Sequence, residues 1–140
     1  MHFESWVTDR YSNVSLSSAV KRHSSHGGLK KFHKALHMAD SMVRGETVVD
    51  FVVGKYSGLG DTLMVITNER VLLLRNTFQT GQSLSFDLQT LDQAKLSYFP
   101  LLGHTLTLNG HRLSRIPAPF VAVLRNLLTA KLSEHWAVAA

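Results

Sequence analysis

The sequence predicts an α+β fold. We expect an N-terminal helical extension, then a strongly bent antiparallel sheet or barrel of seven strands, capped by a C-terminal helix. Three observations support this. Near residue 46 the interval between apolar residues changes from three or four residues to two, which indicates a change from helix to strand. Short turn sequences separate the apolar runs, and Asn109-Gly110 is the clearest because both positions tolerate positive φ. An apolar stripe with helical spacing follows Pro117.

Length and composition are those of a single globular core. The chain has 140 residues, 44% of them hydrophobic, and no cysteine. Disulfides and thiolate metal sites are therefore excluded. No stretch reaches the roughly 20 apolar residues of a transmembrane helix, and the first residues lack the basic-then-apolar order of a signal peptide. We expect a cytoplasmic location.

The first part of the chain is expected to hold one basic helix. Residues 11–18 have the composition of a loop or cap, and residues 24–28 form a flexible break. A helix then covers residues 29–44, with an apolar stripe at Leu29, Phe32, Leu36, Ala39 and Val43. Gly45 is placed to end it.

Seven strands and one helix are expected after Gly45. The strands are predicted at residues 46–54, 62–67, 70–75, 82–88, 91–99, 103–108 and 111–116. In the fourth, Leu84, Phe86 and Leu88 alternate with polar residues and predict a half-buried strand. The last helix carries the apolar stripe Phe120, Val123, Leu124, Leu127, Leu128 and Leu132.

This order resembles the pleckstrin-homology (PH) fold. The start Gly45-Glu46, the apolar strand that follows and the turn Thr67-Asn-Glu-Arg70 are similar to bacterial PH-like domains of the YokE-like type and to GRAM domains. The similarity covers about residues 36–133. It divides the chain into an extension, residues 1–44, and a PH-like domain, residues 45–136. It implies a binding module rather than an enzyme.

The resemblance also implies a place for a ligand. In PH domains a basic grip around the first hairpin holds phosphoinositides. The matching residues here are Lys55 and Tyr56, with Arg70 at the start of the third strand. The matching loop has one basic residue, so the chain departs from the family pattern, and a protein partner or self-association is favoured over a specific lipid.

The net charge of +5 is unevenly placed along the chain. Residues 10–44 contain seven basic residues and one acid. Five of the basic residues form the predicted cluster Lys21, Arg22, Lys30, Lys31 and Lys34. They could neutralise phosphates of an anionic lipid surface or of nucleic acid. Nucleic acid is the less favoured of the two, since no recognisable nucleic-acid motif is present. The alternative is that these basic residues form an ordinary solvent-exposed helix face without a ligand.

An apolar segment surrounds Pro100. Tyr98, Phe99, Leu101 and Leu102 would form an interface if they lay in an exposed loop, and Trp136 could extend it. The alternative, which the sequence favours, is a strand end tucked under the last helix.

Residues that could carry chemistry are sparse. His33 and His37 share a helix face at a spacing that allows one metal ion to be chelated, but the glutamate of a metalloprotease motif is missing. No serine lies in a nucleophile elbow. We predict no catalytic residue, no metal and no cofactor.

The function predicted from the sequence is a non-catalytic binding or scaffolding module. It would act through an unknown protein partner or as a homo-oligomer. The alternative is an anion-binding module that uses the basic helix on phosphates of a membrane, where the protein would be peripheral, or of nucleic acid.

Overall fold

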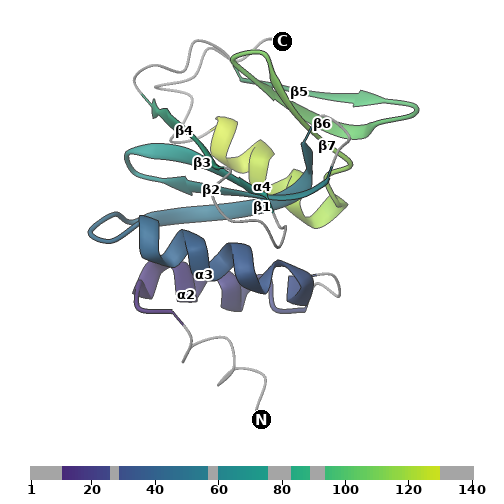
Figure 1. Ribbon diagram of the computed structural model, residues 1–140. Helices are drawn as coiled ribbons and strands as arrows, with labels where there is room; N and C mark the ends of the chain where they lie inside the picture. Colours follow the sequence, from purple (N-terminus) through teal and green to yellow (C-terminus); the bar gives the residue numbers. More distant parts are fainter. Residues whose placement is uncertain (1–10, 26–28, 57–59, 76–82, 89–93, 130–140) are drawn as a thin grey trace.

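The computed structural model describes residues 11–25, 29–56, 60–75, 83–88 and 94–129 (Figure 1). These residues form three α-helices, a short 3-10 helix and a seven-stranded antiparallel sheet, so the α+β class is confirmed. Among them, no helix has the length and apolar character needed to cross a membrane. The elements, in chain order, are α2 (Val14–Arg22), η1 (Leu29–Phe32), α3 (His33–Met42), β1 (Val48–Tyr56), β2 (Gly60–Thr67), β3 (Arg70–Arg75), β4 (Ser83–Asp87), β5 (Ala94–Phe99), β6 (Gly103–Leu108), β7 (His111–Ser114) and α4 (Ala118–Thr129).

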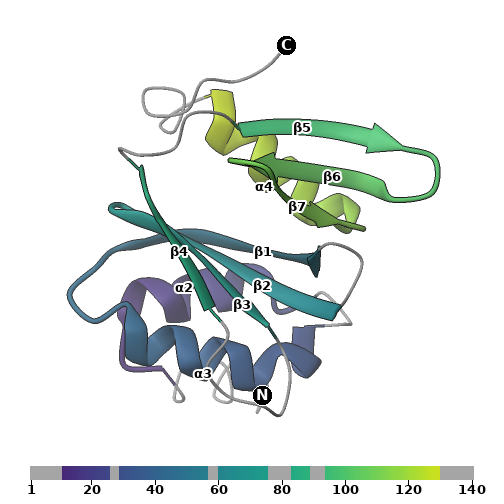
Figure 2. The ribbon, with the colours of Figure 1, turned by 45° about the horizontal axis from the view of Figure 1, so that its top comes forward.

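The first strand lies at the centre of the sheet. The strand order is β4-β3-β2-β1-β7-β6-β5. β1 pairs with β2 from Val48 to Tyr56 but with β7 only at Lys55 and Tyr56. That short pairing joins the two halves of the sheet. Figures 1 and 2 show β5, β6 and β7 in a different plane from β1 to β4.

The sheet is open, so the barrel alternative is wrong. β4 and β5 are its two edges. In β4, Leu84 is 38% exposed and Phe86 is half-buried, while Leu88, just after the strand, is buried. The predicted apolar face of this strand is therefore buried only at its end, because β4 is an edge strand that is largely exposed to solvent.

Gly54 allows β7 to approach β1. A Cβ atom added to Gly54 would lie 2.7 Å from the carbonyl oxygen of Ser114 and 2.8 Å from Cγ of Leu113. Both distances are too short for a real contact, and one involves backbone. The absence of a side chain at Gly54 is therefore a condition for the pairing of β1 with β7.

The helices pack against the sheet in two groups. α2 and α3 lie on one side, where α2 contacts β1 and α3 contacts β2 and β3, whereas α4 lies on the side of β5 to β7 (Figures 1 and 2). The two groups meet at β1. There the ring of His23, after the end of α2, lies 5.1 Å from the Phe51 ring and 4.8 Å from the Phe120 ring.

Helix α2 was missed by the sequence prediction, which assigned residues 11–18 to a loop or cap. Asn13 caps this helix, and its side chain accepts a hydrogen bond from the Leu16 amide at 3.1 Å. Leu16, Ala19 and Val20 are fully buried at helical spacing. The serines lower helix propensity, but the cap and the buried apolar face outweigh this effect.

Asp40 holds the start of α2 against α3. Its carboxylate accepts hydrogen bonds from the amides of Ser12 and Asn13, both at 2.9 Å. Burial alone would raise the pKa of Asp40. The amide hydrogen bonds, the Ser12 hydroxyl and the nearby His37 outweigh burial and lower it. Asp40 therefore stays ionised at neutral pH and keeps both acceptors.

Most other predicted elements are confirmed, with shifted ends. β3 and β6 have the predicted bounds. The turn between β6 and β7 has φ of 46° at Asn109 and 85° at Gly110, as its two-residue sequence requires. The predicted helix of residues 29–44 begins with a 3-10 turn and ends at Met42. Residues 91–93 of the fifth predicted strand lie outside the described residues.

We predict that Gly54→Ala lowers the free energy of unfolding by about 1–3 kcal/mol, the usual cost of overpacking, because Ser114 must move. The matched control is Gly60→Ala, since a Cβ there meets nothing within 4 Å. Urea unfolding of both variants measures the difference. Equal stability of the two would show that β7 does not need the space at Gly54.

Candidate functional site

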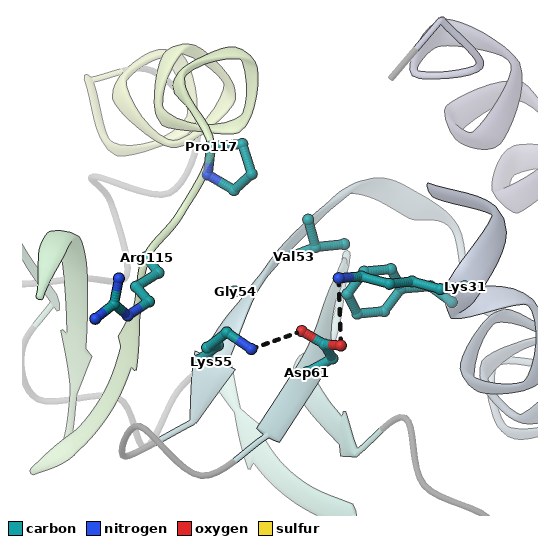
Figure 3. A pocket seen from close by; sticks show the side chains of 8 residues that line it. Lys31, Val53, Gly54, Lys55, Asp61, Arg115 and Pro117 are labelled. Atoms are coloured by element: carbon teal, nitrogen blue, oxygen red, sulfur yellow. Dashed lines mark hydrogen bonds and ion pairs between the residues drawn. The ribbon is translucent and has the colours of Figure 1, made fainter. Parts of the chain in front are cut away.

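A shallow pocket lies where the N-terminal helices meet the sheet. Its volume is about 130 Å³, and it is lined by Lys31, Phe32, Val53, Gly54, Lys55, Asp61, Arg115 and Pro117 (Figure 3). These residues come from η1, β1, β2 and the connection from β7 to α4. One water occupies about 30 Å³ of liquid, so the pocket admits a larger polar group.

Two lysines in the pocket share one carboxylate. Nζ of Lys31 lies 3.3 Å from Oδ2 of Asp61, and Nζ of Lys55 lies 3.2 Å from Oδ1 (Figure 3). Lys55 and Asp61 face each other because they are register partners at the end of the β1–β2 hairpin. Lys31 reaches the same carboxylate from η1, so the ion pairs join the N-terminal segment to the hairpin.

Asp61 is held in its charged form. Its partial burial acts to raise its pKa, but the hydrogen bonds from Lys55 and Lys31 and their positive charges outweigh burial. The net effect is a lowered pKa. The carboxylate is thus ionised at neutral pH and orients both ammonium groups toward the pocket.

Arg115 adds a third positive charge at the opposite rim. Its backbone has a positive φ of 52°, which is uncommon outside glycine, and its amide donates to the carbonyl of Leu102 at 2.9 Å. Its side chain is exposed and points away from Asp61 (Figure 3). The pocket therefore has three cations and one anion among its lining residues.

The predicted basic cluster is not gathered into one site. Lys31 reaches the pocket, but Arg22 donates to the carbonyl of Val49 at 3.0 Å and lies 3.6 Å from the carboxylate of Asp50. Arg22 thus fastens α2 to β1. The other three members are exposed on the helices and do not line the pocket: Lys21, Lys30 and Lys34.

The first-hairpin candidates are also separated. Lys55 lines the pocket, whereas Oη of Tyr56 lies 2.7 Å from Nδ1 of His111, and the Tyr56 ring lies under the Arg75 guanidinium at 5.7 Å. Neighbouring residues in a strand point to opposite faces, which explains why Tyr56 is absent from the pocket lining.

Arg70 fastens the start of β3 to the segment between α3 and β1. Its guanidinium binds both carboxylate oxygens of Glu46, the shortest contact being 2.8 Å, and donates to the carbonyl of Met42 at 2.6 Å. It lies beside Thr67, which pairs with Val48 at the far end of β1 from Lys55. The structure therefore does not bring Arg70 to the pocket.

The segment around Pro100 is exposed, so the favoured alternative of a strand end under the last helix is wrong. Tyr98 is 65% exposed and Leu101 is 85% exposed, whereas Phe99 and Leu102 are half-buried. The Phe99 ring lies under the Arg112 guanidinium at 5.5 Å. Trp136 lies outside the described residues.

The histidine pair belongs to a ring cluster. The rings of His33 and His37 are 4.5 Å apart, and His37 stacks on Tyr11 at 4.9 Å. Within the described ranges, no group of three His, Cys, Asp or Glu residues could hold a metal ion.

Comparison of the chain with family models, curated proteins and solved structures finds no match. The PH-like family is therefore a prediction that rests on the sequence pattern.

Sequence reasoning did not identify Asp61 and Arg115 as site residues. Asp61 lies six residues after Lys55, between the first and second predicted strands, and this spacing was a usable signal. Arg115 had no comparable signal, because its position depends on the crossing of β7 over Gly54.

Proposed function

We propose that this chain is a non-catalytic binding module with a PH-like fold, and that it binds a phosphate-bearing anion in the pocket of Lys31, Lys55 and Arg115. The observation that carries the proposal is the meeting of three cations, from segments distant in sequence, around one pocket with a single opposing carboxylate.

Asp61 gathers both lysines at the pocket and competes with an incoming anion for them. Both ammonium groups lie within 3.3 Å of its carboxylate, so a bound anion must take their charge from Asp61. A phosphate near these groups would gain charge-assisted hydrogen bonds.

Arg115 is exposed, so its side chain can change rotamer within picoseconds to nanoseconds and turn toward the ligand. Its planar guanidinium suits phosphate oxygens.

The PH-like assignment is supported by the element order. Seven antiparallel strands precede the C-terminal helix, and the pocket lies at the end of the first hairpin. The cations differ from the family pattern, since only Lys55 belongs to that hairpin. Lys31 comes from the N-terminal segment and Arg115 follows β7. The ligand is therefore defined by its negative charge rather than as an inositol phosphate.

A binding role fits the chemistry of the lining. The pocket walls combine positive charge with apolar surface from Phe32, Val53 and Pro117, and the lining residues include no Ser, Cys or His. Such a surface can hold and orient an anion. The lining residues themselves offer no nucleophile paired with a general base.

Titration calorimetry with inorganic pyrophosphate at low salt tests the proposal. Lys55→Ala should weaken binding about two- to fivefold, the size expected for one exposed charge. Asp61→Asn should strengthen binding by a similar factor, because it removes the competing negative charge. Lys30→Ala is the matched control, since Lys30 is an exposed lysine outside the pocket lining.

The critical result is that Lys55→Ala weakens pyrophosphate binding whereas Asp61→Asn strengthens it. If Lys55 and Asp61 formed only a structural ion pair, both substitutions would weaken binding or leave it unchanged. Absence of pyrophosphate binding at low salt, where screening is weakest, would exclude the proposed site.

Protein contact or self-association is a second candidate, and the exposed edge strand β5 favours it. β5 pairs only with β6 among the described strands, and it carries Tyr98 at 65% exposure. An unpaired edge can add a strand from another chain.

If the chain self-associates through β5, light scattering coupled to size-exclusion chromatography should show a dimer that Tyr98→Glu converts to a monomer. A monomeric wild type would rule out self-association.

A further inference from the structure

The turn between β5 and β6 exposes large apolar side chains. We call residues 98–104 the hairpin tip. Tyr98 is 65% exposed and Leu101 is 85% exposed, while Pro100 between them is exposed as well. The carbonyl of Leu102 is fixed by the Arg115 amide at 2.9 Å, so the tip is fastened to the residue that lines the pocket. Neighbouring exposed apolar side chains of this kind are typical of an interaction surface.

The part of the chain that carries the tip is free of acids. Residues 94–129 contain four Lys and Arg residues and no Asp or Glu, whereas residues 45–93 contain six acids and three bases. Two of these cations lie close to the tip. Arg112 lies over the Phe99 ring at 5.5 Å, and Arg115 contacts Leu102. The apolar tip is therefore flanked by positive charge.

The tip and the pocket lie at the same end of the molecule. In Figures 1 and 2, β1 ends and β2 begins at the end where β5 turns into β6. Arg115 connects the two features, because it lies at the rim of the pocket while its amide donates a hydrogen bond to the carbonyl of Leu102 in the tip. One flat anionic surface could contact both.

We propose that the hairpin tip and the pocket together dock on an anionic lipid bilayer. Tyr98 and Leu101 enter the interfacial layer, Arg112 and Arg115 contact headgroup phosphates, and the pocket holds one of these phosphates. This inference rests on the proposed anion-binding function and adds the source of the phosphate. Tyrosine rings favour the boundary between headgroups and acyl chains, and basic side chains gain from the negative surface potential.

Charge favours a lipid surface over a second copy of the chain. Two tips facing each other would bring Arg112 and Arg115 of one copy against the same cations of the other, with no acid in residues 94–129 to compensate. An anionic bilayer supplies negative charge next to apolar material, which matches the two kinds of side chain at the tip.

Vesicle co-sedimentation of the full chain tests the proposal. We expect binding to vesicles of phosphatidylcholine with phosphatidylserine, weaker binding at high salt, and little binding to phosphatidylcholine alone. Leu101→Asp should weaken binding roughly tenfold or more, because a leucine side chain is withdrawn from the apolar layer. Arg112→Ala should weaken it about fivefold.

Val14→Asp is the matched control for Leu101→Asp. Val14 is 78% exposed and begins α2, on the helical side of the sheet, away from β5 and β6. An acid in the first turn of a helix is compatible with its dipole, so this variant should fold and bind vesicles as the wild type does. Thermal unfolding confirms that both variants are folded.

Three results would overturn the inference. Pyrophosphate binding without vesicle binding would leave the anion site standing and exclude the bilayer. Equal losses of vesicle binding from Leu101→Asp and Val14→Asp would show that binding does not depend specifically on the hairpin tip. A wild-type dimer that Leu101→Asp dissociates would identify the tip as a contact between copies of the chain.

Discussion

Among the described strands, the two halves of the sheet are joined where β7 approaches β1 closely at Gly54. β1 and β7 pair at only two positions, Lys55 and Tyr56, and among the described strands this is the sole pairing between the halves of the sheet. A side chain at Gly54 would meet backbone at 2.7 Å. The missing Cβ is therefore a packing requirement, because it lets two hairpin systems become one bent sheet with a shared hydrophobic core.

The pocket is a consequence of that crossing. Lys55 and Asp61 face each other through the register of the first hairpin, which is a local property. Arg115 reaches the same place because β7 passes over Gly54, and Lys31 because η1 packs against β2. Three separate segments thus supply the positive charges. The site exists only when the helices, the first hairpin and the β7–α4 connection are all in place.

Much of the fold could be predicted from the sequence, because strand periodicity and turn chemistry are local. The Asn109-Gly110 turn and the bounds of β3 are examples. Features set by tertiary contacts could not. The burial of the α2 face overrides its serine-rich composition, the edges at β4 and β5 leave the sheet open, and the position of Arg115 depends on long-range pairing. The acid-free character of residues 94–129 is masked in the overall charge by the six acids of residues 45–93.

In the function proposed above, Lys31, Lys55 and Arg115 form one anion site from three separate segments. Chemical-shift mapping by NMR during a titration with pyrophosphate tests it most directly. We expect the amides of these residues and of Asp61 to shift together, with a single dissociation constant. Shifts confined to the helical segment that carries Lys21, Lys30 and Lys34, with none at Lys55 or Arg115, would contradict it.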